Sequence, residues 1–489
     1  MKKLFYVILF NLYLVSGFSQ EQKYGYLYAY INDTTTVTRV REQLRSNNEN
    51  LNNALENFKV FSFKYPFPKI KDEYLSRTVA IECNCDIKEL AEFLKKNFSK
   101  DFSDIEYGQG GEAYPDYAPS DAMWYQTNPD GTPVLWHLNK IEADKAWDIT
   151  KSSSNITVAI IDRGFDISHP DLANKIVSTT DSYTGNPFRN YTGIESYHGT
   201  FCASCAGAET DGGGQLASVG FNTMLRFYDY VTTSGLYAVT LAYDASFDKG
   251  ADILSFSWGG LTSATTQEKN LVKAVLDNGT VIVRSAGNTQ DNSDNDRFPF
   301  AYQVDNRIII VTSTDKDDCH SRSGGTPHAN YPQVSICSPG YDVMGAVRYN
   351  NGSVANPYKI GSGTSYATPI VAGVCALLKS INKNLTPAEI KNIIKTTADP
   401  VADANLYPGI IGAGRVNANN AVQYVCNYPY KFTDKVVTSN TTINYCGDIY
   451  VEDVSVQGPA QLELRSDGKT IINGNFNLKT GARLNINPQ

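Results

Sequence analysis

Residues 271–288 read LVKAVLDNGTVIVRSAGN, a helical apolar pattern followed directly by a short, mostly apolar strand. Strands of the same kind recur along the chain, at 156–162 (ITVAIID), 251–256 (ADILSF) and 307–314 (RIIIVTST). Strands that are apolar on both faces and alternate with helices are typical of a parallel sheet covered by helices on each side. From 136 to about 426 we therefore predict an α/β fold with a doubly wound parallel sheet, whose active groups gather at the carboxyl ends of the strands.

Composition limits the classes of function. The 489 residues are 42% hydrophobic, which is enough for at least one large core, and the formal net charge is −8. Nucleic-acid-binding domains usually carry a basic face that matches the phosphates, and the sequence has no cluster of Lys and Arg of that kind. We therefore expect no nucleic-acid partner.

The first 19 residues have the pattern of a signal peptide. Lys2 and Lys3 precede an apolar stretch from Leu4 to about Val15, and small residues follow it. The stretch is shorter than the roughly 20 residues that a membrane-spanning helix needs. We therefore predict cleavage after Ser19, no stable membrane anchor and a secreted product.

Two further modules flank the predicted α/β domain. Residues 20–115 read as strand, helix (36–45), two strands, helix (86–98) and strand, a βαββαβ pattern of the α+β class, and a linker rich in Gly and Pro follows at 108–121. Residues 427–489 carry short alternating segments separated by turn residues. They predict a small all-β module of stacked strands.

Three reactive residues stand at the ends of predicted elements. Asp162 ends the strand ITVAIID, His198 begins the small-residue stretch HGTFCASCAG, and Ser365 begins the helix after GSGT. Each residue alone has a purely structural interpretation. Asp162 could be a strand-end cap, His198 a hydrogen-bonded, half-buried ring, and Ser365 a helix N-cap. Together, in the order Asp, His, Ser and with the spellings HGT and GTSYATP, they resemble the subtilisin-like serine proteases, the subtilase family, over about 136–423.

The resemblance implies a catalytic triad and an acyl-enzyme. A serine hydroxyl is a poor nucleophile until a base removes its proton, and His198 has the unperturbed pKa that suits a base. Asp162 would hold the ring tautomer, and Ser365 at a helix N-terminus would gain from the helix dipole and from its own N–H as an oxyanion donor. Asn288, which ends IVRSAGN, resembles the family's oxyanion-hole asparagine, although Gly-Asn is also an ordinary turn.

A substrate-binding strand is implied in the same way. Ser257, Trp258 and Gly259 in LSFSWGG occupy the place where the family pairs an extended peptide with a strand edge. Because Gly259 and Gly260 leave the first pocket open, we expect broad cleavage with a preference for apolar or aromatic side chains. The acidic loop DNSDND (291–296) could instead favour basic residues or hold a cation, but a solvated loop is the simpler interpretation.

Some residues depart from the family pattern. Arg163 follows the aspartate where Ser or Thr is usual, and Phe201 and Ser204 replace the usual His and Gly after HGT. These positions line the back of the catalytic pair, so they bear on the rate and on the pH profile. Cys202 matches a cysteine of proteinase K-like members and is expected to be buried. Arg284, beside the oxyanion strand, has no physical explanation from the sequence.

No cofactor is required for the chemistry that the resemblance implies. Structural Ca²⁺ is common in the family, and Asp171 matches one of its ligands, while Asp211 in ETDGGGQ is a second candidate. Two carboxylates do not make a site of six to eight oxygen ligands. Calcium is therefore an expectation for structure only.

Nine cysteines are compatible with disulfides in an oxidising compartment, and their odd number leaves at least one unpaired within the chain. Two pairs bracket short loop-rich stretches and are the first to test, namely Cys319 with Cys337 and Cys426 with Cys446. The CxxC spelling of Cys202 and Cys205 would suit redox or metal chemistry, but two small buried core residues are the simpler interpretation.

We therefore predict a secreted serine endopeptidase that acts on polypeptides. Residues 20–115 resemble the family's inhibitory propeptide, so the enzyme's own propeptide is an expected partner, and 116–426 would be the peptidase domain. Self-cleavage is expected between about Tyr107 and Asp121. The alternatives are a catalytically impaired, protease-like binding protein and a cell-surface adhesion module led by the C-terminal β region.

Overall fold

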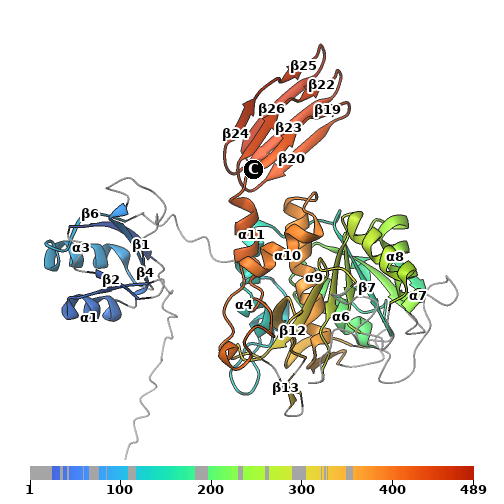
Figure 1. Cartoon of the computed structure of the whole chain (residues 1–489), viewed down its shortest axis with the longest axis horizontal. Coiled ribbons are helices and arrows are strands. Elements are labelled where there is room, and N and C mark those ends of the chain that lie inside the picture. The colour runs from blue at the N-terminus through green and yellow to red at the C-terminus, as the bar shows by residue number, and fades with distance from the viewer. Residues whose placement is uncertain are drawn as a thin grey trace, which may run out of the picture. The chain divides into compact units, whose positions relative to one another are not determined.

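The computed structural model describes residues 25–32, 37–40, 43–58, 60–64, 76–83, 85–107, 117–181, 197–229, 235–258, 264–288, 304–320, 322–323, 326–327, 329–347 and 356–488 (Figure 1). The expected signal peptide, most of the linker, Gly259 with Gly260, and the loop 291–296 lie outside the described residues. The chain divides into two compact units, Met1–Pro115 and Asp116–Gln489.

The first unit is built on a four-stranded antiparallel sheet. Its strands run in the order β4-β5-β1-β6, with β1 at Gly25–Ile31, β4 at Val60–Lys64, β5 at Thr78–Cys83 and β6 at Phe102–Tyr107. Helices α1 (Glu49–Asn57) and α3 (Ile87–Asn97) bury their apolar side chains in the same core as the strands. The unit is therefore of the α+β class.

One element of this unit differs from the prediction. In place of a helix at 36–45, the chain forms an antiparallel hairpin of β2 (Val37–Val40) and β3 (Gln43–Ser46). The β-branched residues of VTRV favour an extended strand. The helix begins only after Asn48, whose side chain accepts from the N–H of Asn50 as an N-cap.

The second unit contains the predicted doubly wound parallel sheet. Its seven strands run in the order β15-β12-β11-β10-β7-β9-β8 and all pair in parallel. In chain order they are β7 (Thr157–Asp162), β8 (Ile176–Asp181), β9 (Met224–Asp229), β10 (Ile253–Phe256), β11 (Val281–Ser285), β12 (Ile309–Thr314) and β15 (Ile336–Pro339).

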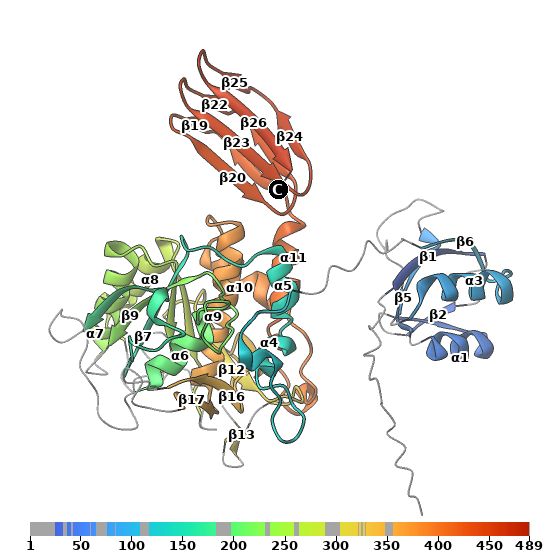
Figure 2. The same ribbon diagram turned by 180° about the vertical axis from the view of Figure 1, so that it is seen from behind.

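Helices cover both faces of this sheet. Val158 and Ile160 of β7 pack in one core with α6 (His198–Gly207), α9 (Thr364–Ile381), α10 (Pro387–Thr396) and α11 (Ala418–Cys426). Ala159 and Ile161 face a second core with α7 (Gly235–Tyr243) and α8 (Thr266–Asp277), which lie side by side in Figures 1 and 2. Burial on both faces explains why the strand sequences are mostly apolar.

Helix α9 lies in the centre of the first core. Among the described helices it is the one with the length and hydropathy of a membrane span, but 83% of it is buried inside the unit. Its residues contact strands β7, β10, β11 and β12 and helices α6 and α11. The helix that carries Ser365 is therefore fixed by packing along its length.

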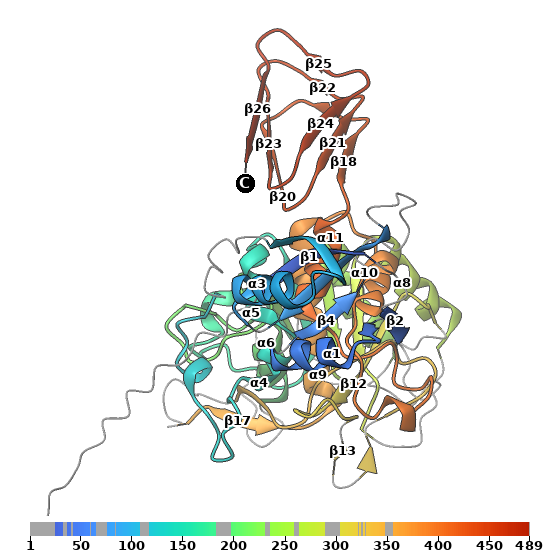
Figure 3. The ribbon, with the colours of Figure 1, turned by 90° about the vertical axis from the view of Figure 1, so that its left-hand side faces the viewer.

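The C-terminal strands form a coil of three successive turns. Strands β18, β21 and β24 make one parallel sheet, β19, β22 and β25 a second, and β20, β23 and β26 a third. Figure 3 shows these sheets as the sides of a triangle around an apolar interior. The bounds are β18 Tyr430–Thr433, β19 Val436–Val437, β20 Thr441–Tyr445, β21 Ile449–Glu452, β22 Ser455–Val456, β23 Gln461–Ser466, β24 Thr470–Asn473, β25 Asn477–Leu478 and β26 Arg483–Pro488.

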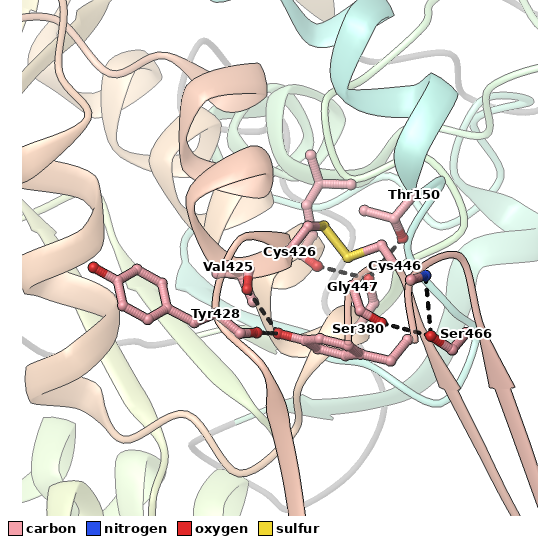
Figure 4. The surroundings of a disulfide bond; sticks show 11 residues. Thr150, Ser380, Val425, Cys426, Tyr428, Cys446, Gly447 and Ser466 are labelled. Carbon is pink, nitrogen blue, oxygen red and sulfur yellow. Dashed lines mark hydrogen bonds between the residues drawn. A yellow bond between two sulfur atoms is a disulfide. The ribbon is translucent and has the colours of Figure 1, made fainter. Parts of the chain in front are cut away.

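A disulfide ties this coil to α11. Cys426 at the end of α11 bonds to Cys446 after β20, and the hydroxyl of Tyr445 donates to the carbonyls of Val425 and Tyr428 at 2.7 and 2.5 Å (Figure 4). Side chains of the coil also belong to the same continuous core as α9 and α11. The coil is therefore anchored by covalent, polar and apolar contacts.

Cys319 and Cys337 differ from the prediction, whereas Cys202 and Cys205 agree with it. Cys319 and Cys337 are free, because Cys337 lies buried in the sheet and its thiol donates to the carbonyl of Ile411, while the thiol of Cys319 donates to the carbonyl of Asp317. A second disulfide instead joins Cys83 and Cys85 at the end of β5. Cys202 and Cys205 are free and buried on α6.

Candidate active site

The three predicted catalytic residues lie at the ends of packed elements. Asp162 is the last residue of β7, His198 is the first of α6, and Ser365 is the second of α9. These elements are neighbours in the fold, because α6 contacts both β7 and α9. The carboxyl end of a central strand thus meets two helix N-termini, the place where open α/β sheets bind their ligands.

Asp162 and His198 are joined directly. Oδ1 of Asp162 lies 2.7 Å from Nδ1 of His198, and it also accepts from the N–H of Arg163 at 2.6 Å. The first turn of α6 is held by the same loop, since the N–H groups of Gly199 and Thr200 donate to the carbonyls of residues 163 and 164. With Nδ1 donating to the carboxylate, Nε2 is the nitrogen left to accept a proton.

The pKa of His198 reflects two opposing effects. Burial of the ring lowers the pKa, but the negative charge of Asp162 and its hydrogen bond outweigh burial, so that the pKa stands well above the ordinary value. Cys202 beside the ring remains a thiol, because burial raises its pKa to about 12. The site is therefore arranged to stabilise an imidazolium.

Ser365 is held through both its hydroxyl and its carbonyl. Its Oγ donates to the carbonyl of Ser257 at 3.0 Å, and its own carbonyl accepts from the hydroxyl of Ser257 at 2.7 Å and from the thiol of Cys202 at 3.4 Å. Catalytic hydrogen bonds are often unformed until substrate binds. If Ser365 is the nucleophile and His198 its base, the hydroxyl must turn away from Ser257 before it attacks.

Asn288 is oriented by the residue before the candidate nucleophile. Its Oδ1 accepts from the N–H and the hydroxyl of Thr364 at 2.9 and 3.0 Å, and that hydroxyl also accepts from the N–H of Gly287. Since the amide oxygen is engaged, the NH₂ group is the part of the exposed Asn288 side chain that faces outward as a donor. This is the orientation that an oxyanion donor requires.

The substrate-strand residues are placed only in part. Ser257 is nearly buried and contacts Ser365, as described above. The indole of Trp258 donates to the carbonyl of Ile161 at 2.7 Å and packs on Phe256, so it joins the ends of β10 and β7. Gly259 lies outside the described residues.

The residues that depart from the family pattern have specific contacts. Phe201 is buried against Tyr366, and the hydroxyl of Ser204 accepts from the N–H of Ala346 at 2.9 Å, which ties α6 to β16 (Val343–Ala346). A glycine in place of Ser204 could not make that bond. Apart from its place directly after Ser365, Tyr366 has no feature in the sequence that would single it out.

Arg284, which the sequence left unexplained, supports the segment that leads to Asn288. Its wholly buried guanidinium donates to the carbonyl of Ser285 and to the hydroxyl of Tyr331, both at 2.9 Å. That hydroxyl in turn donates to the carbonyl of Ala286 at 3.3 Å. The charge therefore fixes the two residues that precede Gly287 and Asn288.

Asp171 and Asp211 both hydrogen-bond to protein groups, and a structural calcium site at these residues stays a prediction. Both carboxylate oxygens of Asp171 accept protein donors, namely the N–H groups of Gln215 and Leu216 and the hydroxyl of Tyr358. Both oxygens of Asp211 are also engaged, by residues 117 and 120. Neither aspartate belongs to a cluster of three potential ligand residues in the described ranges. Their visible role is to hold neighbouring chain segments.

Comparison with known proteins decides the family. Residues 153–424, more than half of the chain, match the subtilase family. The chain belongs to the subtilase family. Subtilases are serine-type endopeptidases. The chain is therefore a hydrolase of this type.

Individual subtilases agree with this assignment. A thermophilic serine proteinase of a Bacillus species is 32% identical over 316 residues, which cover 63% of this chain and 70% of that protein. Thermitase of Thermoactinomyces vulgaris is 32% identical over 288 residues, 58% of this chain and 94% of that protein. A solved protease structure from Pseudoalteromonas arctica superposes with a TM-score of 0.52 at 25% identity, covering 63% of this chain and all of that one.

Proposed function

We propose that the protein is a secreted endopeptidase that cleaves peptide bonds through an acyl-enzyme on Ser365 and is made as a self-processing precursor. The observation that carries the proposal is the 2.7 Å contact between Asp162 and His198 beside the N-terminus of the helix that bears Ser365. Membership of a family of serine proteases supports the same chemistry.

The reaction follows from the roles of these side chains. Nε2 of His198 takes the proton of Ser365 as Oγ attacks the carbonyl carbon, and the imidazolium is stabilised by Asp162. The tetrahedral oxygen receives hydrogen bonds from Nδ2 of Asn288 and from the N–H of Ser365. His198 then protonates the leaving amine, and a water activated by the same ring releases the acid from the acyl-enzyme.

The pH dependence follows from His198. Only the neutral ring can accept the proton of Ser365, and the pKa of His198 is raised above its ordinary value, with the opposing effect of burial outweighed by Asp162. The fraction of neutral ring therefore increases as the pH rises through that pKa. We expect activity to be lost on the acid side and to persist on the alkaline side.

The proposals of export and of maturation are supported by the sequence, by a relative and by the N-terminal unit. The chain begins with the pattern of a signal peptide, and one relative is named a halolysin-like extracellular serine protease. The compact N-terminal unit precedes the peptidase unit and has its own core, as an inhibitory propeptide would. We propose the same location and precursor form for this chain, with other polypeptides as substrates.

A fluorophosphonate probe tests the proposal. The purified wild-type protein is expected to be labelled at Ser365, as located by peptide mass spectrometry, and both Ser365→Ala and His198→Ala are expected to lose labelling. A folded protein that neither labels nor hydrolyses a denatured protein substrate would overturn the enzymatic proposal. That result would favour the alternatives, a protease-like binding protein or an adhesion module.

A further inference from the structure

Three aromatic rings meet beside the candidate nucleophile. The ring of Tyr366, directly after Ser365, lies 5.7 Å from the imidazole of His198 between centroids and is inclined to it by 40°. The ring of Tyr366 also contacts the ring of Phe201. Their centroids are 3.9 Å apart and their planes are inclined by 34°. His198 and Phe201 are three residues apart on α6, so they lie on one face of that helix.

The hairpin of β16 and β17 (Tyr358–Gly361) closes over this ring pair. A Cβ at Gly345 would lie 2.4 Å from the ring of Phe201, and a Cβ at Gly361 would lie 2.7 Å from the ring of Tyr366. Only glycine allows so close an approach at these two positions. The hairpin is also fixed to α6 by the bond from the N–H of Ala346 to Ser204.

The pair is consequently confined. Phe201 is buried, and burial raises the pKa of the Tyr366 phenol, so that its ring stays neutral. Dense packing on several sides leaves a side chain few alternative rotamers. Tyr366 therefore presents a fixed aromatic surface to the imidazole.

His198 requires a support of this kind. Among the residues that the structure describes, Nδ1 of His198 bonds Asp162, and the thiol of Cys202 lies 3.9 Å from the same nitrogen. Both contacts act on one atom, so the ring can still pivot about it and carry Nε2 away from Ser365. The hydroxyl of Ser365 is itself turned toward Ser257, so Nε2 must hold its place while the hydroxyl rotates.

We propose that Tyr366, backed by Phe201, is a positioning residue that keeps the imidazole of His198 in its catalytic orientation. The proposal rests on the proposed function of this site. Positioning acts on the chemical step, because a small displacement of a reacting group lowers the rate without weakening substrate binding. The ring of Tyr366, and not its hydroxyl, carries the effect.

The test compares a variant that keeps the ring with one that removes it. Tyr366→Phe is expected to keep kcat and KM within about twofold of wild type, whereas Tyr366→Leu is expected to lower kcat by about tenfold with KM unchanged. Phe201→Leu weakens only the packing behind Tyr366. Its kcat is therefore expected to lie between those of Tyr366→Phe and Tyr366→Leu. Phe432→Leu, a buried aromatic change in the C-terminal coil, is the control for lost packing and is expected to lower the melting temperature without changing kcat.

A spectroscopic readout separates positioning from simple stability. The proton shared by His198 and Asp162 gives a far-downfield NMR resonance, which is expected to persist in Tyr366→Phe and to broaden through faster exchange with water in Tyr366→Leu. Apart from the phenol of Tyr366 itself, Asp162 and Cys202 are the titratable groups that act on the imidazole among the described residues, and both are unchanged in these variants.

The outcomes are distinct. An unchanged kcat and resonance in Tyr366→Leu would overturn the proposal, and so would a loss in Tyr366→Phe equal to that in Tyr366→Leu. A raised KM with normal kcat would make Tyr366 a substrate contact instead. If Tyr366→Leu fails to fold, Phe201→Leu decides alone, and an unchanged kcat and resonance in that variant would overturn the proposal. Failure of the wild-type protein to label or hydrolyse would overturn the proposed function itself.

Discussion

Ser257 and Ser365 hydrogen-bond to each other in both directions. The hydroxyl of Ser365 donates to the carbonyl of Ser257 at 3.0 Å, and the hydroxyl of Ser257 donates to the carbonyl of Ser365 at 2.7 Å. The end of β10 and the start of α9 are thereby joined at the candidate nucleophile. The candidate substrate strand and the candidate nucleophile are therefore linked directly by two hydrogen bonds.

Ser257→Ala is expected to lower kcat/KM by about three- to tenfold, since a neutral hydrogen bond contributes about 0.5–1.5 kcal/mol. The carbonyl of Ser257 remains, so Ser257→Ala removes the bond of its hydroxyl to the Ser365 carbonyl and its side-chain contact with the thiol of Cys202. Steady-state kinetics on a peptide substrate measures the effect. Ser246→Ala is the matched control, because its hydroxyl bonds Thr280 and not Ser365. Equal losses in the two variants would mean that the effect is general destabilisation.

The second prediction concerns the hydrogen bond between Thr364 and Asn288, the candidate oxyanion donor. Thr364→Val keeps the shape but removes the hydroxyl that bonds Asn288 and Gly287. We expect kcat to fall by about tenfold, less than the ~10² to 10³ expected for Asn288→Ala, because the N–H of residue 364 still holds the amide oxygen. Thr364→Ser is expected to restore the rate. Wild-type kcat in Thr364→Val would show that the hydroxyl does not orient the amide.

The sequence predicted the parts of the fold that depend on local pattern. Mostly apolar strands such as β7 could be located because burial on both faces requires a continuous apolar run in the sequence. Asp162, His198 and Ser365 could be singled out because each stands at one end of a predicted element, within spellings that resemble those of the subtilases.

Features that depend on contacts between distant segments could not be predicted. A disulfide needs two Cα atoms at a suitable separation, and the spacing of Cys319 and Cys337 says nothing about that. The support of Arg284 by Tyr331 joins residues 47 positions apart. The contact of Phe201 with Tyr366 likewise exists only because α6 packs on α9.

The buried His137 is expected to make the free energy of unfolding depend on pH. Complete burial lowers its pKa to about 3, whereas in the unfolded chain the pKa is near 6.5. Above pH 6.5 both states are neutral and the ring has no effect. As the pH falls below that value the unfolded state binds a proton that the folded state does not, so stability falls by up to about 1.4 kcal/mol per pH unit.

His137→Leu removes this titration and is expected to flatten the pH dependence of unfolding between pH 6.5 and 4. Denaturant melts of the two proteins in the Ser365→Ala background, which prevents autolysis, give the difference curve. Its slope isolates His137 from the carboxylates that titrate in both proteins. Parallel stability curves would contradict the prediction.

The disulfide at the base of the C-terminal coil is expected to stabilise the protein. Replacing both Cys426 and Cys446 by Ser is expected to lower the free energy of unfolding by ~3 kcal/mol, the value for a loop closed over a separation of 20 residues. Calorimetry under oxidising and reducing conditions measures it. Cys319→Ser, which removes a free thiol, is the control and is expected to change nothing. A double variant as stable as wild type would mean that packing alone anchors the coil.

The start of the peptidase unit narrows the expected cleavage site. The N–H of Tyr117 donates to Asp148 at 3.1 Å, and the N–H and hydroxyl of Ser120 donate to Asp211 at 2.6 and 3.0 Å. The N–H of Asp211 in turn donates to Asp121 at 3.0 Å. A cut within 117–121 would free a segment that these bonds hold against the unit.

We therefore predict that self-cleavage falls after Tyr107, the end of β6, and before Tyr117, so that the mature chain keeps the bonds to Asp148 and Asp211. Mass spectrometry of the intact mature protein reads the new N-terminus directly. Ser365→Ala and His198→Ala are expected to remain uncut in a refolding reaction free of other proteases, because cleavage needs the nucleophile and its base. A mature N-terminus beyond Tyr117 would show that these bonds do not hold the segment, and cleavage of Ser365→Ala at the same bond would assign maturation to an external protease.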